Sequence, residues 1–204
     1  MHKVSTASGI DEKGDAMDML QATAFPNGGS LVLGNGYRAT IRPITAASRP
    51  LIETAMTRLS PESSRRRFFT PRFRLSEREL IHLTSPDGVR HFAVGVCGRN
   101  ADGTLEGIAA ARFVRTDDNS AVAEIALTVI DAFQGMGIGK TLLAHLIAAA
   151  SLRGIDRLRA LMTPDNTPVL RLIRRYAPSA RFVYDGEILT ADIPLSGLPL
   201  ARAA

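Results

Sequence analysis

The sequence of 204 residues has no tryptophan and only one cysteine, Cys97. A single cysteine excludes an internal disulfide framework and is compatible with a reducing compartment. Cys97 directly follows the apolar residues 92–96, so we interpret it as a small buried side chain and not as a nucleophile. The four histidines are not spaced as metal ligands, so the sequence predicts no metal site.

Long apolar runs are absent as well. The sequence has no stretch of roughly 18 apolar residues, the length that a membrane span requires. Residues 1–20 contain no apolar segment of the kind found in signal peptides. These absences lead us to expect a cytoplasmic protein without a membrane partner.

The charge balance is basic, with a net charge of +5 and a pI of about 10.0. Such a balance favours anionic partners, among them a phosphate-rich cofactor, an acidic protein surface and a nucleic acid. Nucleic-acid recognition is not favoured, because no basic patch is interleaved with aromatic residues. Arginines cluster at positions 65–67 and 171–175, where solvated helix faces are the simplest interpretation and a functional anion site is the alternative.

The chain length suits one folded domain. Residues 1–36 are rich in glycine, serine, aspartate and lysine, with apolar density only at residues 31–33. We interpret residues 1–36 as an extended or partly disordered arm. The expected domain then covers residues 37–195, followed by a short tail over residues 196–204.

Within that domain, alternating and helical apolar spacings follow one another. Strands are expected over residues 38–44, 91–97, 105–114, 121–130, 157–162, 181–184 and 187–193. Helices are expected over residues 45–59, after Ser60-Pro61, after the capping box at residues 76–79, and over 139–153 and 167–176. This order predicts a mixed α/β (α+β-like) fold, with a central twisted sheet of about six to seven strands and helices on both faces.

The segment 134–141 (QGMGIGKT) carries the clearest chemical signal. It joins an expected strand to an expected helix, so its free N–H groups and the helix dipole create an anion site, usually for phosphate. A nucleotide P-loop would need glycine five positions before Gly139, where Gln134 stands. The dinucleotide fingerprint also fails, because the glycines fall at 135, 137 and 139. A tight turn without a ligand is the simple alternative.

The pattern Gln134-x-x-Gly137-x-Gly139 resembles the Q/R-x-x-G-x-G/A pyrophosphate loop of the GNAT N-acetyltransferase superfamily. The expected element order over residues 38–193 is similar to that fold. Four further segments look like the catalytic domain of bacterial Pat-type protein lysine acetyltransferases: residues 60–69 (SPESSRRRFF), 75–76 (LS), 123–126 (AEIA) and 165–168 (DNTP). Larger family members carry an additional regulatory or acyl-CoA-synthetase-like domain, for which we expect no room here, so family-style regulation is not assumed.

The resemblance implies acetyl-CoA as co-substrate and no metal. It implies that the backbone of Leu127, Thr128 and Val129 contacts the pantetheine arm. The pyrophosphate is then expected at Gln134, Gly135, Met136, Gly137, Ile138, Gly139, Lys140 and Thr141. Asn166 resembles the asparagine that bonds the pantetheine arm, and a helix N-cap is its alternative role.

The same resemblance implies that Glu124 is the general base. An unperturbed lysine amine has a pKa of about 10.4, so only roughly one amine in a few thousand is neutral at pH 7, and a carboxylate can take its proton during attack. A solvent-facing or ion-paired strand residue is the alternative for Glu124. Many relatives place a tyrosine acid seven residues after the asparagine, where this chain has Ile173; we interpret Tyr176 as a packing residue.

The leading expectation is therefore acetylation of a protein lysine ε-amine, for example on an acyl-CoA synthetase. Three alternatives stay open: acetylation of a small amine, a non-catalytic acyl-CoA sensor, and a basic nucleic-acid binder. The sequence does not identify the acceptor, and the oligomeric state is left open between monomer and homodimer.

Overall fold

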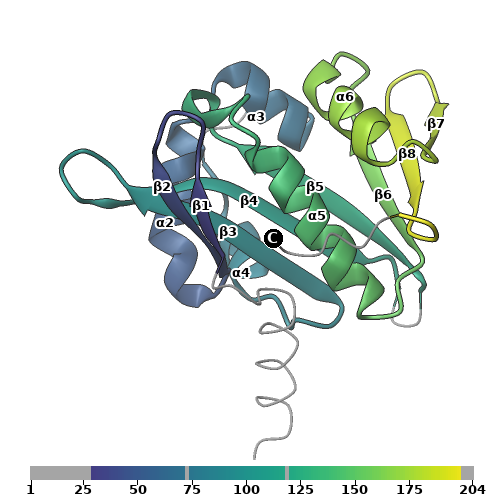
Figure 1. The fold of residues 1–204 in the computed structure, drawn as a ribbon, viewed down its shortest axis with the longest axis horizontal. Coiled ribbons are helices and arrows are strands. Elements are labelled where there is room, and N and C mark those ends of the chain that lie inside the picture. The colour runs from purple at the N-terminus through teal and green to yellow at the C-terminus, as the bar shows by residue number, and fades with distance from the viewer. Residues whose placement is uncertain (1–28, 72–73, 118–119, 199–204) are drawn as a thin grey trace, which may run out of the picture.

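A computed structural model describes residues 29–71, 74–117 and 120–198. One sheet of eight strands has the order β1-β2-β3-β4-β5-β6-β8-β7 (Figure 1). The strands are β1 (Ser30–Val32), β2 (Arg38–Pro43), β3 (His91–Arg99), β4 (Leu105–Arg115), β5 (Val122–Val129), β6 (Arg157–Met162), β7 (Arg181–Tyr184) and β8 (Leu189–Pro194). Neighbouring strands are antiparallel except β5 and β6, which are parallel.

Helices cover both faces of this sheet (Figure 1). They are α2 (Arg49–Thr57), α3 (Pro61–Phe68), α4 (Glu77–Thr84), α5 (Ile138–Ser151) and α6 (Thr167–Tyr176), with short 3-10 turns η1 (Ala46–Ser48) and η2 (Asp131–Phe133). Helix α5 packs on β4 and β5, and α2 packs on β4 from the opposite side. None of the helices in the described ranges has the length and hydropathy of a membrane span.

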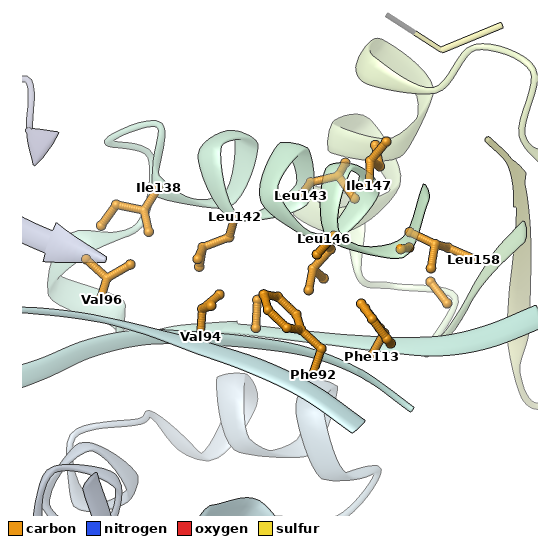
Figure 2. Close-up of a cluster of buried hydrophobic side chains, with 14 of the residues drawn as sticks. Phe92, Val94, Val96, Phe113, Ile138, Leu142, Leu143, Leu146, Ile147 and Leu158 are labelled. Atoms are coloured by element: carbon orange, nitrogen blue, oxygen red, sulfur yellow. The ribbon is translucent and has the colours of Figure 1, made fainter. Parts of the chain in front are cut away.

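The main core lies between α5 and the sheet. Figure 2 shows Leu142 and Leu146 of α5 facing Val94 and Phe113 of the strands. All four side chains are fully buried. Helix α5 is thereby held firmly against the sheet, which fixes the position of its first turn.

A β-bulge sets which side chains of β4 face α2. Val96 pairs with Ala109 and Cys97 pairs with Gly107, so Ile108 is an extra residue in β4. An extra residue reverses the alternation of side chains along a strand. Gly107 therefore lies on the same face as Arg112, the face covered by α2 and α3.

The helix starts follow the caps in the sequence. The hydroxyl of Ser60 accepts a hydrogen bond from the N–H of Ser63 (3.1 Å), and Pro61 occupies the first turn of α3. Ser76 and Glu79 form the expected capping box of α4. Such caps satisfy N–H groups that have no partner inside the helix.

The predicted fold class and the element order from residue 38 onward are confirmed. The expected domain start at Tyr37 is wrong, because the sheet begins earlier, with β1 at Ser30–Val32. A three-residue edge strand among glycines gives little periodic signal, which explains the error. The expected arm over residues 1–28 and the end of the expected tail, 199–204, lie outside the described residues.

The parallel strands β5 and β6 separate along their length. They pair at four positions, from Val122 opposite Arg157 to Ile125 opposite Ala160. Beyond Ile125, residues 126–129 of β5 keep their pairing with β4 but have no partner in β6. The opening between the two strands positions the site described next.

Candidate functional site

A cavity of about 350 Å³ lies where β5 and β6 separate. Leu127, Thr128 and Val129 of β5 form one wall, and Tyr176 and Leu172 of α6 contribute to another. A strand edge without a neighbour presents free N–H and C=O groups, which an extended ligand can bind as an added strand would. The three β5 residues predicted from the sequence therefore lie together at an available strand edge.

The loop before α5 closes one end of this cavity. Gly135 and Gly137 line it and have φ angles of 76° and 84°, a conformation that side chains with a Cβ rarely adopt. A Cβ added at either glycine would meet no atom within 4 Å. The loop thus leaves open space beside both glycines.

The N–H groups of this loop are free to bind an anion. The first hydrogen bond into α5 runs from the N–H of Thr141 to the C=O of Gly137 (3.2 Å). Within the described ranges, the N–H groups of residues 135–140 have no main-chain acceptor. They stand at the positive end of the α5 dipole, which favours phosphate.

Thr141 and Met136 differ from the other residues of the loop. The N–H of Thr141 is occupied by Gly137, contrary to the expectation that it is available to phosphate, because it forms the first helical hydrogen bond. The side chain of Met136 packs against the hydrophobic core and does not line the cavity, while its main-chain N–H belongs to the free group of residues 135–140. Ile138, Gly139 and Lys140 do line it.

Gln134 directs its side chain toward the protein. Its amide nitrogen Nε2 donates to the C=O of Val129 (3.0 Å) and to the hydroxyl of Ser63 (3.1 Å). That hydroxyl in turn donates to the carboxylate of Asp131 (2.8 Å). Gln134 therefore connects the loop to β5 and α3, and its main-chain N–H donates to the C=O of Asp131 (3.2 Å), contrary to the expectation that Gln134 binds pyrophosphate.

Asn166 is the N-cap of α6, since its side-chain oxygen accepts a hydrogen bond from the N–H of Val169 (3.4 Å). It is 8% exposed and lines the cavity. The alternative role weighed from the sequence is thus observed, and it leaves the amide group of Asn166 beside the proposed ligand space. Asp165 pairs with Arg65 of α3 (2.5 Å), and this contact lowers the pKa of Asp165 to about 2.

Glu124 is exposed at the wall of a neighbouring cavity of about 630 Å³. Its Cα lies opposite that of Arg159, but the guanidinium of Arg159 pairs with Asp192 (3.0 Å). In the described part of the chain, no hydrogen bond or ion pair engages the Glu124 carboxylate. The two cavities share Leu127 and Asn166 as lining residues, so they adjoin at the same stretch of β5.

The residues near the expected acid position also have defined places. Ile173 is buried at 1% exposure. Tyr176 lines the cavity, and the ammonium group of Lys140 lies 5.5 Å from the centre of its ring. Tyr176 therefore packs against the loop, as a cation–π partner of Lys140.

Several contributors to this region were not singled out from the sequence. Asp131 and Ser63 were given no individual role, and their contact emerges only where α3 meets the loop. Arg112 is 7% exposed and lines the cavity that contains Glu124. A charged residue within the apolar stretch of β4 was the signal that could have identified it.

The family comparisons agree with this geometry. The family model "Acetyltransferase (GNAT) family" matches residues 55–177. Acetyltransferase Pat of Mycolicibacterium smegmatis is 34% identical over 135 residues, which make up 66% of this chain and 39% of that protein. This chain thus spans about two fifths of the length of that curated relative.

Solved structures show the same fold. The GNAT domain of S. lividans PAT matches with a TM-score of 0.71 and 28% identity, over 81% of this chain and 96% of that chain. The protein yncA from Salmonella typhimurium, whose structure contains its cofactor acetyl-CoA, matches with a TM-score of 0.60 over 81% of this chain and 99% of that chain. At 17% identity, the likeness to yncA shows the fold alone.

The resemblance inferred from the sequence is thereby confirmed. The matched segment contains Glu124, the open edge of β5, the glycine loop and Asn166. This chain belongs to the acetyltransferase (GNAT) family.

Proposed function

We propose that this protein is an N-acetyltransferase that moves an acetyl group from acetyl-CoA to a primary amine, the ε-amine of a protein lysine. The observation that carries the proposal is the juxtaposition, on one strand, of the open edge at residues 126–129 and the unpaired carboxylate of Glu124. The first element binds an extended thioester arm. The second element accepts a proton.

The residues present fit acetyl-CoA as a co-substrate. The free N–H groups of residues 135–140 suit its pyrophosphate, and Gly135 and Gly137 leave the space that phosphate oxygens need. The open edge of β5 at Leu127, Thr128 and Val129 suits the amide groups of the pantetheine arm. Asn166 borders the same space and can bond that arm.

The reaction we infer is a direct transfer. The neutral amine nitrogen attacks the thioester carbonyl carbon, a C–N bond forms, and the C–S bond breaks as coenzyme A leaves as a thiolate. Glu124 takes the proton that the amine loses, directly or through one water, and this proton ultimately goes to the thiolate. A carboxylate with no hydrogen bond or ion pair in the described ranges is suited to this role.

No tyrosine acid is required by this scheme. Ile173, at the position where many relatives carry a tyrosine, is buried in the core. A thiol is a fair leaving group without a protein acid, because its pKa is only about 8.5. We therefore assign no catalytic proton to Tyr176.

The lysine acceptor is supported by the relative from Mycolicibacterium smegmatis, which is named Acetyltransferase Pat, and by the resemblance of residues 60–69 and 165–168 to Pat-type enzymes. The cavity at Glu124 is open to solvent and has a volume of about 630 Å³, which is sufficient for a lysine side chain presented by another protein. An acyl-CoA synthetase is the protein substrate that we would test first.

A small amine is the second candidate. A separate cavity of about 370 Å³ lies between α2 and the sheet and is lined by Thr128 and Ala126 of β5. Its wall is largely apolar, with Leu51, Ile52 and Ala55 from α2. This cavity is large enough for a small amine, which favours testing free amines beside proteins.

The deciding experiment uses labelled acetyl-CoA, an acyl-CoA synthetase and a panel of free amines. We expect label on lysine of the synthetase, a loss of transfer by at least about a hundredfold in Glu124→Gln, and unchanged acetyl-CoA affinity in that variant. Glu187→Gln, at an exposed position in the β7–β8 turn, is the matched control and should retain full activity. Equal rates in Glu124→Gln and the control would exclude Glu124 as the base.

A further inference from the structure

Two arginines border the cavities around β5 without a carboxylate partner. Arg112 of β4 and Arg67 at the end of α3 both line the cavity beneath α2 and the cavity that contains Glu124. Arg67 also lines the cavity beside the glycine loop. Within the described residues, neither guanidinium forms an ion pair with an acidic side chain.

The hydrogen bonds of Arg112 leave part of its guanidinium available. Its Nη1 contacts the C=O of Leu83 (3.3 Å) and the Nε2 atom of His91 (3.2 Å). Both contacts use the same nitrogen, and a guanidinium carries five N–H donors. Among the described residues, no acceptor is found for Nε or Nη2, and the group borders two cavities.

Arg67 is similar. Its guanidinium lies 4.8 Å from the centre of the Phe68 ring, and in the described ranges no hydrogen bond engages it. Burial lowers the pKa of Arg67 to about 10. For Arg112, burial and then the positive charge of Arg67 lower the pKa to about 9. Two buried cations that repel each other cost folding free energy, and an anion bound between them would offset this cost.

The position of this pair relates it to the chemistry. Arg112 lies opposite Ala126 in the β4–β5 ladder. The next residue, Leu127, is the first of those assigned to the thioester arm. Arg112 is therefore paired with β5 between Glu124 and the residues assigned to the thioester arm, and its side chain lines the same cavity as Glu124.

We infer that Arg67 and Arg112 form a carboxylate-binding subsite, so that one of the two reacting molecules carries a carboxylate beside its reacting group. This inference rests on the proposed function for the location of the acyl group and goes beyond it, because neither acetyl-CoA nor a lysine side chain carries a carboxylate beside its reacting group. The carboxylate belongs either to the acyl chain of the thioester, as in a dicarboxylic acyl-CoA, or to the amine acceptor. Arginine suits this task because its planar fork binds carboxylates in a bidentate manner.

The test compares pairs of ligands that differ in one carboxylate. For the acyl chain, isothermal titration calorimetry measures the binding of succinyl-CoA and butyryl-CoA. For the acceptor, the rate of acetyl transfer is measured with 5-aminopentanoate and pentylamine. We expect a preference for the carboxylate member of about 10- to 100-fold in one pair, from charge-assisted hydrogen bonds, and that pair identifies the source.

Variants separate this role from a structural one. Arg112→Met and Arg67→Met should each remove the preference without lowering thermal stability, since an uncompensated buried cation is replaced by an apolar chain. Arg67→Lys should restore it only in part. Arg181→Met, at an exposed position of β7, should leave it intact.

Failure of the proposed function is distinguishable from failure of the subsite. If no CoA thioester binds, the acetyltransferase proposal fails, and the thermal shift with hexanoate against 1-hexanol then tests the arginines alone. A shift with hexanoate that disappears in both methionine variants supports the subsite. Equal behaviour of both members in every ligand pair, or a preference that survives in both variants, overturns the subsite.

Discussion

The carboxylate of Asp131 accepts hydrogen bonds from both the main-chain N–H of Ser60 (2.9 Å) and the hydroxyl of Ser60 (2.8 Å). Burial acts to raise the pKa of Asp131, but these bonds and the one from Ser63 outweigh it and lower that pKa. Through Asp131, the start of helix α3 is attached to the turn that leads into the glycine loop. The position of the loop thus depends on a contact between segments about 70 residues apart.

Asp131→Ala should weaken acetyl-CoA binding although Asp131 does not line the cavity. The loop loses its attachment to α3, and we expect a rise in Kd of about tenfold, equivalent to one charge-assisted hydrogen bond. Isothermal titration calorimetry gives the value. Asp102→Ala, in the β3–β4 turn, removes a similar turn carboxylate far along the chain and should leave Kd unchanged. An identical Kd in wild type and Asp131→Ala would show that the loop holds its shape unaided.

Gly137→Asp should abolish acetyl-CoA binding, because a carboxylate would stand where phosphate is expected. The matched control is Gly103→Asp in the β3–β4 turn. Both glycines have a φ of 84° and no atom within 4 Å of an added Cβ, so the backbone strain is comparable. Thermal shift with acetyl-CoA should vanish for Gly137→Asp and persist for Gly103→Asp. Retention of the shift in both variants would place the pyrophosphate elsewhere.

Asn166→Ala should combine a loss of stability with a loss of affinity. Removal of the N-cap of α6 costs about 1 kcal/mol of unfolding free energy. Ser76→Ala removes the N-cap of α4, which lies outside the cofactor cavity, and should cost a similar amount. Urea unfolding and calorimetry together should show that only Asn166→Ala raises the Kd for acetyl-CoA. If both variants bind alike, Asn166 is a cap and nothing more.

The stability of the protein should fall between pH 7 and pH 5 because of His91. Burial, with the charges of Arg112 and His82 acting in the same direction and Asp87 against them, lowers the pKa of His91 from 6.5 to about 4. The unfolded state then binds the extra proton as the pH falls through 6.5, so the stabilisation present above that pH is lost progressively down to about pH 4.

We expect His91 to contribute about 2 kcal/mol to the decrease in unfolding free energy from pH 7 to pH 5. Urea titrations at the two pH values measure it. His91→Gln should show a smaller decrease than the wild type. A decrease of the same size in His91→Gln would assign the pH dependence to other groups.

The fold could be predicted from the sequence wherever one face of an element is apolar. Two examples are the spacing of Leu142 and Leu146 in α5 and the capping box that begins at Ser76. Both depend only on residues close in the chain, so they can be recognised in the sequence. Strand β1 was missed because three edge residues bury little surface. The bulge at Ile108, which places Gly107 on the same face as Arg112, has no sequence signature of its own.

The site likewise has some parts that local sequence patterns predict and others that depend on contacts between distant elements. The glycine loop and the Glu124 stretch are local patterns and were identified together with a family resemblance. The contact of Asp131 with Ser60, and the place of Arg67 beside Arg112, depend on how distant elements meet. Arg67 was interpreted with its neighbours as part of a solvated helix face, yet it turns into the wall of three cavities.

The short pairing of β5 with β6 is a narrow connection between two parts of the sheet. Four paired positions form the seam between a half-sheet of five strands, β1 to β5, and a half-sheet of three, β6 to β8. A molecule bound in this opening would contact residues 127–129 of β5 and also α6, the helix that follows β6. Amide hydrogen exchange along β6 should therefore slow when a ligand occupies the opening between β5 and β6. The exchange rate of β6 would then report whether the ligand is bound.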